Sequence, residues 1–309
     1  MKKIGIFCGA DISFPLSLID YINSKEEDVT AELVKIGAYR IDDKLNYDII
    51  FDRVSQSVPM YQSILKSLFA KGKIVINNPF TRCLEDYFFQ LSLAKDLGLN
   101  IPETAIIPTK QHPIGTTSET FQNLIYPLDW SELFDYIGFP MFVRMNLLSS
   151  ENLTYKVYNP MEFFSAYDNS GSRQLVVQKA YDFSNYYRAF IIGKKNIKIF
   201  TYDITKPLVS RYSKDNSTLS PSHRKEIESV ATKLSELYNL DFNTIDFAVF
   251  DGKIYILNFY NTAPKIDTII FDTDEYQWFV FTTGDFLLSV LDNPQDYLRT
   301  SRWHTVFRI

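Results

Sequence analysis

The chain has 309 residues, of which 46% are hydrophobic, 16% aromatic and 22% charged, a composition typical of a folded globular protein with room for about two domains. The net charge of -5, without a lysine- or arginine-rich run, argues against a nucleic-acid backbone as the principal partner. The only cysteines, Cys8 and Cys83, are too few and too far apart for a zinc site or a disulfide framework.

The first residues do not resemble a targeting segment. The start MKKIGIFCGADISF has only a very short apolar run before Asp11, unlike a signal peptide or a membrane span. We therefore expect a cytoplasmic protein with no membrane partner, whose thiols are reduced.

The first part of the chain alternates strands and helices. An apolar run over residues 3–8 ends at Gly9, and helix-like spacing follows over residues 15–23. Because strands and helices alternate, we expect a parallel α/β sheet. Further strands are predicted at residues 29–36, 47–51 and 72–77, and a further helix at residues 61–70.

The middle of the chain again mixes helices and strands. A helix over residues 84–97 ends at Gly98, and the polar, turn-rich residues 110–120 are the best candidate for a loop or linker. An apolar run covers residues 105–108. Additional helices are predicted at residues 129–137 and from Pro160 onward, and strands at residues 141–145 and 175–178.

The last part predicts a largely antiparallel sheet followed by helices. Strands are expected at residues 188–192 and 197–202. A helix over residues 221–237 has Ser222 as its predicted cap, and another helix covers residues 276–292.

A β-hairpin is predicted between Thr244 and Pro264, because two apolar stretches flank the turn Asp251-Gly252. Side chains alternate across a strand, so residues 257, 259 and 261 share one face, and Asp246 on the partner strand could lie opposite them. A carboxylate and the Asn261 amide oxygen would then converge, while Asn258 would point to the other face. The alternative is an ordinary buried hairpin.

Four phrases occur in an order that resembles the ATP-grasp superfamily over most of residues 84–264: GFPMFVRM, LVVQKAY, YYRAFIIGKK and IDFAVFDGKIYILNFYNTAP. The resemblance implies an ATP-grasp-like α/β fold with ATP and Mg2+ as cofactors. It also implies an N-terminal Rossmann-like domain at residues 1–80, a linker and small lid subdomain at 81–181, and a C-terminal subdomain at 182–309, the last two being α+β.

The same resemblance assigns roles to individual residues. Arg144 occupies the position of a phosphate-contacting lysine, and Gln178, Lys179 and Tyr181 belong to the hinge segment that meets adenine. Either Asp182 or Asn185 would meet the ribose. Each of these has an ordinary alternative: a salt-bridged surface arginine for Arg144, and a buried strand that ends in polar residues for the hinge.

Arg188 resembles the arginine that faces the transferred phosphoryl group and is the predicted catalytic residue. Lys198 would belong to the same basic wall, although a solvated charge on a strand is the simpler interpretation. Asp246 and Asn261 fall on the positions that hold the metal ion, here Mg2+ bound to ATP.

Three departures from the family pattern lie in the expected site. Phe259 stands where a metal-binding glutamate is expected, residues 146–150 contain no glycine, and Asp86-Tyr87 replaces an Asp-Lys pair. Two functions therefore stay open. The first is an ATP-dependent carboxylate-amine or carboxylate-thiol ligase that forms an acyl phosphate on a small-molecule or peptide carboxylate.

The second is a catalytically degenerate nucleotide- or peptide-binding module that regulates or binds other proteins. A protein-binding scaffold that has lost the nucleotide site is a third alternative. A homodimer is also kept open, because nothing in the sequence fixes the oligomeric state.

Overall fold

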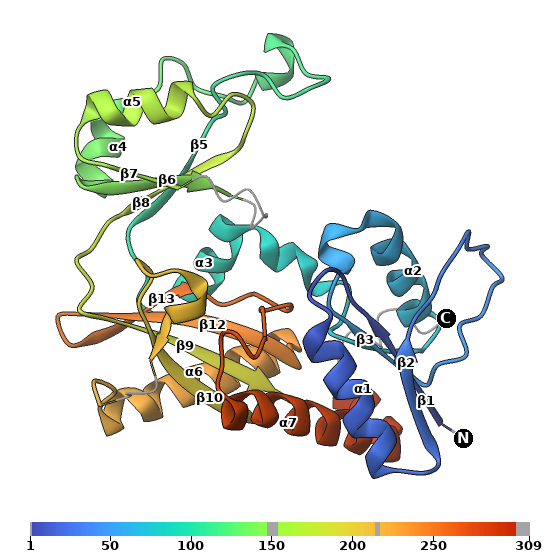
Figure 1. The fold of residues 1–309 in the computed structure, drawn as a ribbon. Helices are drawn as coiled ribbons and strands as arrows, with labels where there is room; N and C mark the ends of the chain where they lie inside the picture. The colour runs from blue at the N-terminus through green and yellow to red at the C-terminus, as the bar shows by residue number, and fades with distance from the viewer. Residues whose placement is uncertain (1, 147–153, 214–216, 301–309) are drawn as a thin grey trace. The chain divides into compact units, whose positions relative to one another are not determined.

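The computed structural model describes residues 2–146, 154–213 and 217–300 (Figure 1). The chain forms two compact units. Unit 1 comprises Met1–Cys83, Tyr187–Ile245 and Phe259–Ile309, and unit 2 comprises Leu84–Tyr186 and Asp246–Asn258. Among the described residues, no helix is both long enough and apolar enough to cross a membrane.

Unit 1 begins with a parallel sheet of order β2-β1-β3-β4, as the alternation of elements predicted. Its strands are β1 (Lys2–Phe7), β2 (Val29–Leu33), β3 (Ile49–Asp52) and β4 (Ile74–Ile76). Side chains alternate along β1, so Ile4 and Ile6 pack with helix α1 (Ser13–Lys25), while Phe7 packs with helix α2 (Pro59–Ala70) on the other face. The short 3-10 helices η1 (Ser55–Ser57) and η2 (Thr81–Glu85) follow β3 and β4.

The second sheet has the order β11-β10-β9-β12-β13, and β9 and β12 each contribute residues to both units. The strands are β9 (Asn185–Ile192), β10 (Asn196–Tyr202), β11 (Tyr212–Ser213), β12 (Phe242–Phe250) and β13 (Lys253–Asn258). Also in unit 1 are η4 (Leu208–Ser210) and the helices α6 (Pro221–Tyr238), α7 (Thr273–Asp292) and α8 (Pro294–Thr300).

Helix α6 shows where the predicted cap was wrong. The N-cap is Ser220, whose side chain accepts a hydrogen bond from the His223 N–H, and Ser222 already lies in the first turn. Pro221 occupies the first helical position, where a missing N–H does no harm, and this moves the cap to the residue before it.

Unit 2 contains an antiparallel sheet of order β5-β8-β6-β7. Its strands are β5 (Thr104–Ile107), β6 (Met141–Met145), β7 (Thr154–Val157) and β8 (Leu175–Lys179). Helices α4 (Trp130–Ile137) and α5 (Pro160–Asp168) cover one face with an aromatic cluster (Figure 1). The opposite face packs on α3 (Tyr87–Asp96), which begins later than the sequence predicted. A 3-10 helix, η3 (Ser118–Phe121), lies in the predicted loop.

The hairpin of β12 and β13 turns where predicted, with positive φ at both Asp251 (49°) and Gly252 (70°). Its register is not the expected one. A bulge between Asp246 and Phe247 pairs Asp246 with Asn258, so the alternation argument that excluded Asn258 was wrong. Because the bulge adds one residue to one strand, every side chain beyond it changes its partner.

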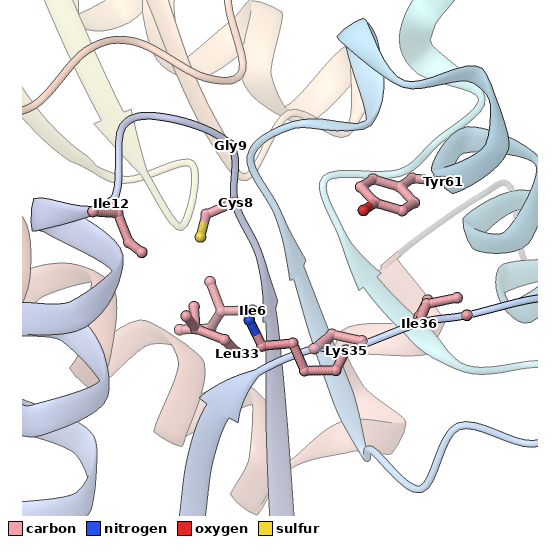
Figure 2. Close-up of a pocket in the computed structure, with 10 residues that line it drawn as sticks. Ile6, Cys8, Gly9, Ile12, Leu33, Lys35, Ile36 and Tyr61 are labelled. Carbon is pink, nitrogen blue, oxygen red and sulfur yellow. The ribbon is translucent and has the colours of Figure 1, made fainter.

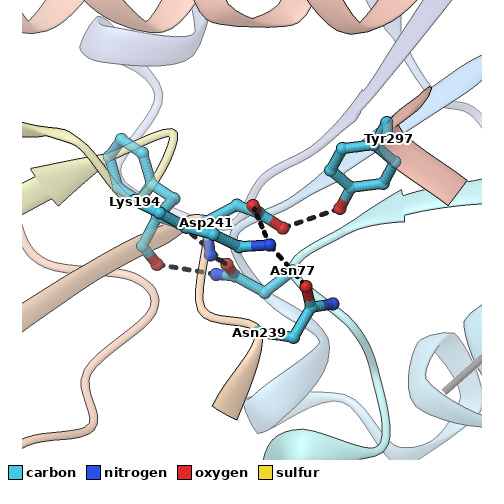
Figure 3. A network of polar contacts seen from close by, with 6 residues as sticks. Asn77, Lys194, Asn239, Asp241 and Tyr297 are labelled. Atoms are coloured by element: carbon cyan, nitrogen blue, oxygen red, sulfur yellow. Dashed lines mark hydrogen bonds and ion pairs between the residues drawn. The ribbon is translucent and has the colours of Figure 1, made fainter. Parts of the chain in front are cut away.

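A buried polar network joins four segments of unit 1 (Figure 3). Asp241 is buried, its carboxylate lies 3.3 Å from the Lys194 ammonium, and its Oδ2 accepts a 2.6 Å hydrogen bond from the Tyr297 hydroxyl. Lys194 also donates to the Asn239 side chain, and Asn77 accepts the N–H of Asp241. Burial raises the pKa of Asp241, and the neighbouring Lys194 and Tyr297 oppose that effect.

Candidate functional site

Arg144 lies on β6 of unit 2, opposite Thr154 on one side and Val176 on the other. Its guanidinium carbon is 3.7 Å from the centre of the Tyr87 ring, which is close stacking for a cation on an aromatic face. The Arg144 Nε is buried and has no hydrogen-bond partner among the described residues. Buried donors of this kind are rare, because leaving one without an acceptor is costly.

The Tyr87 ring that stacks on Arg144 is itself held by buried contacts. The ring is fully buried, and its hydroxyl donates to Oε1 of Gln178 at 3.1 Å. The other end of the Gln178 amide donates to Thr104 Oγ1 at 3.0 Å. Both ends of the Gln178 side-chain amide are therefore hydrogen-bonded within unit 2.

The next residues of the hinge segment form a second cluster. Lys179 lies 5.3 Å from the Tyr181 ring, and the Tyr181 hydroxyl donates to the Glu103 carboxylate at 2.9 Å. Desolvation, followed by this hydrogen bond, raises the pKa of Tyr181. Its ring also contacts Phe250, with centroids 4.4 Å apart, while Asp182 is exposed beside it. An aromatic surface thus lies next to the predicted hinge.

Arg188 and Lys198 lie in unit 1 on neighbouring strands. Arg188 is opposite Phe200 and Lys198 is opposite Phe190, so the two cations share one face of the sheet. The Arg188 guanidinium donates to the Tyr212 hydroxyl at 2.8 Å and lies 5.1 Å from the Tyr202 ring. The Lys198 ammonium is 5.3 Å from the Trp278 ring. Each predicted cation is held over aromatic side chains.

The predicted metal ligands fall in different units, Asp246 in unit 2 and Asn261 in unit 1. Asn261 Oδ1 accepts the Ala263 N–H at 3.3 Å, whereas Asn258 is the cross-strand partner of Asp246. The described residues contain no group of three or more His, Cys, Asp or Glu side chains that could hold a metal ion. One carboxylate and one amide oxygen are too few to surround a metal ion. A magnesium ion held by them would take its other ligands from water and phosphates.

Phe259 is fully buried and stacks on Tyr238 with centroids 5.4 Å apart. The residue at the expected glutamate position therefore serves packing in unit 1. Of the glycine-free stretch at residues 146–150, residues 147–150 lie outside the described residues, and Asn146 is buried, with its Oδ1 accepting the Phe88 N–H at 2.8 Å.

The sequence did not single out Tyr87, Glu103 or Asn258 as site residues. Tyr87 was noted only as the replacement for a lysine, and its stacking under Arg144 depends on a contact 57 positions away in the sequence. Residue type could have hinted at this contact, since arginine favours aromatic faces. No local signal marked the bulge that brings Asn258 beside Asp246.

No protein-family model and no curated protein sequence matches this chain. Solved structures do match. The VanG D-Ala:D-Ser ligase from Enterococcus faecalis superposes with a TM-score of 0.69 at 12% identity, covering 94% of this chain and 99% of that one. The D-alanine–D-alanine ligase from Bacillus anthracis complexed with ATP superposes with a TM-score of 0.63 at 14% identity, covering 95% of this chain and 99% of that one.

A third match is the Chryseobacterium gregarium RiPP-associated ATP-grasp ligase in complex with ADP and a leader and core peptide. Its TM-score is 0.60 at 16% identity, with 94% of this chain and 97% of that one covered. The chain therefore has the fold of the ATP-grasp superfamily, with a parallel α/β N-terminal sheet followed by antiparallel sheets, as the order of motifs predicted.

Proposed function

We propose that the protein is an ATP-dependent ligase that activates a carboxylate as an acyl phosphate. The observation that carries the proposal is Arg144, a cation whose buried Nε has no hydrogen-bond partner in the described part of the chain, on the strand where the resemblance implies a phosphate contact. Phosphate oxygens are acceptors that match a guanidinium well. ATP binding by solved proteins of this fold supports the same conclusion.

In the proposed reaction a carboxylate oxygen of the substrate attacks the γ-phosphorus of ATP, and ADP leaves with the electrons of the broken P–O bond. An amine nitrogen or a thiol then attacks the acyl carbon, loses its proton and expels phosphate. Arg144 and Lys179 hold the nucleotide, Tyr181 packs beside the base, and Arg188 faces the transferred phosphoryl, where a fixed cation stabilises developing charge. Lys198 and Asp182 are proposed as lesser contacts.

The chain offers a magnesium ion few protein ligands. Asp246 supplies a carboxylate, and Asn261, or Asn258 through the bulge, supplies an amide oxygen. One ion on the ATP phosphates would need no more protein ligands than these. When bound, such an ion neutralises charge on the phosphates.

The experiment measures phosphate release from ATP in the presence of amino acids and peptides, with hydroxylamine to trap an acyl phosphate as its hydroxamate. Arg144→Met should weaken ATP binding about 10- to 150-fold, the equivalent of about 1.5–3 kcal/mol for charged hydrogen bonds. Arg144→Lys should retain part of it, and Lys95→Met, at an exposed position of α3, serves as the matched control. Equal activity in all variants would remove Arg144 from the proposal.

A second candidate is a nucleotide- or peptide-binding module that performs no ligation. The observation in its favour is Phe259, which fills the expected glutamate position with a fully buried ring. This candidate predicts that ATP binds without hydroxamate formation for any carboxylate in the panel. A hydroxamate that requires both ATP and one carboxylate would reject it.

A further inference from the structure

A cavity of about 570 Å³ lies in unit 1 at the carboxyl ends of β1 and β2 (Figure 2). In open parallel α/β sheets, ligands bind outside this end of the strands. The cavity volume falls within the range of about 300–1,000 Å³ that is usual for small-molecule sites. None of the residues assigned above to the nucleotide or the metal lines it.

The parallel register of the two strands builds one wall. Ile6 lies opposite Leu33, and two residues further along the chain, just past the strand ends, come Cys8 and Lys35, which both line the cavity. Figure 2 shows the Lys35 side chain reaching across the strand ends, with its ammonium on the side where Ile6 and Leu33 lie. Ile12, 44% exposed, borders the same space, and the Tyr61 hydroxyl group turns toward it from the side of α2.

The charge in and around the cavity favours an anion. Within the described part of the chain, no carboxylate forms an ion pair with Lys35, and the acidic residue in the adjoining loop, Asp11, is 3.5 Å from the buried Arg53 instead. Helix α1 starts next to the cavity at Ile12 with no side-chain cap and no acidic residue in its first turn. That helix end already faces a carboxylate, since the Ser13 hydroxyl donates to Asp267 Oδ2 at 3.1 Å, so the preference for an anion rests on Lys35.

The apolar residues define the rest of the ligand. Ile12, 44% exposed, and the partly buried Leu33 offer hydrocarbon surface beside the Lys35 ammonium. A phosphate or a dicarboxylate would leave that apolar surface uncovered, whereas a monocarboxylate with an aliphatic side chain would cover both. Burying apolar surface contributes about 25 cal/mol per Å², so covering Ile12 and Leu33 adds modestly to the affinity.

We propose that this cavity binds an apolar carboxylate of amino-acid to dipeptide size, with the carboxylate on Lys35 and the side chain against Ile12 and Leu33. As the place where the ligase substrate is held, the site rests on the proposed function. As a binding site it does not, so the experiment measures binding alone and contains no ATP.

Cys8 reports directly on occupancy, because its thiol lines the cavity and the second cysteine, Cys83, is exposed elsewhere in unit 1. Burial raises the pKa of Cys8, so alkylation by iodoacetamide is carried out at mildly alkaline pH, where thiolate is present. The alkylation rates of both cysteines are read by mass spectrometry. Cys83 thereby serves as an internal reference in the same sample.

The probe is N-acetyl-L-leucine, and its matched control is N-acetyl-L-leucinamide, which has the same side chain without the charge. At a concentration about ten times its dissociation constant, the acid should slow alkylation of Cys8 about tenfold and leave Cys83 unchanged. The amide should protect much less. Equal protection by acid and amide, or no protection by the acid up to its solubility limit, would overturn the proposal.

Lys35→Met keeps the length of the side chain and removes its charge, so it should abolish protection of Cys8 by the acid. Lys44→Met removes an exposed lysine that does not line the cavity and should leave protection intact. Retained protection in Lys35→Met would show that Lys35 does not hold the carboxylate. Protection of Cys8 without any hydroxamate in the ATP assay would keep this site and reject the ligase.

Discussion

Replacing Tyr297 with phenylalanine tests the buried network of unit 1. The substitution keeps the ring and removes the hydroxyl that donates at 2.6 Å to the Asp241 carboxylate. Hydrogen bonds to charged groups contribute about 1.5–3 kcal/mol, and the Asp241 side chain, only 2% exposed, cannot recover the bond from bulk water. We expect the free energy of unfolding to fall by about 2 kcal/mol. The loss stays in the middle of that range because Lys194 still neutralises the carboxylate.

The assay is differential scanning calorimetry at neutral pH, with Tyr276→Phe as the matched control. The Tyr276 hydroxyl bonds to Ser17 at 3.0 Å, a neutral partner, so its loss should cost about 1 kcal/mol. The difference of about 1 kcal/mol corresponds to about 2–4 °C in Tm. Equal shifts for the two variants, or no shift for Tyr297→Phe, would refute the view that a buried charge makes this hydroxyl important.

Three further substitutions follow from the packing. Phe259→Glu should destabilise unit 1 by more than about 3 kcal/mol in urea unfolding, because the side chain is buried against Tyr238; a stable variant with tighter magnesium binding would contradict this. Gly284→Ala should lower the free energy of unfolding by about 1–3 kcal/mol, since an added Cβ would overlap the Tyr21 ring, and an unchanged Tm would count against that close contact. Tyr87→Phe removes only the hydroxyl and should lower Tm slightly without changing ATP affinity. Tyr87→Leu removes the ring that stacks on Arg144 and should weaken ATP binding in calorimetry. Equal ATP affinities of the two variants would show that the stacking does not position Arg144.

Local signals accounted for much of the fold. The parallel sheet followed from alternating apolar strands and helical spacing, and the hairpin turn followed from Asp251-Gly252, whose backbone has the positive φ that the turn requires. These features depend on residues near one another in sequence. The motif order then identified the superfamily fold, although no single phrase carried that conclusion.

Long-range packing accounted for what was missed. The bulge at Asp246 changes which residue lies opposite it, and nothing in the local pattern marks an extra residue in a strand. Likewise, no local pattern indicated that the Gln178 side-chain amide is hydrogen-bonded to Tyr87 and Thr104, which come from distant parts of the chain. Such contacts are set by tertiary structure, which periodicity does not encode.

The central claim is that this fold still binds ATP through Arg144. Its most direct test is calorimetric titration with a non-hydrolysable ATP analogue, with and without magnesium, of the wild type and of Arg144→Met. We predict binding that magnesium strengthens and that Arg144→Met weakens about 10- to 150-fold. Absence of binding in both conditions, or equal affinity in both proteins, would contradict the account.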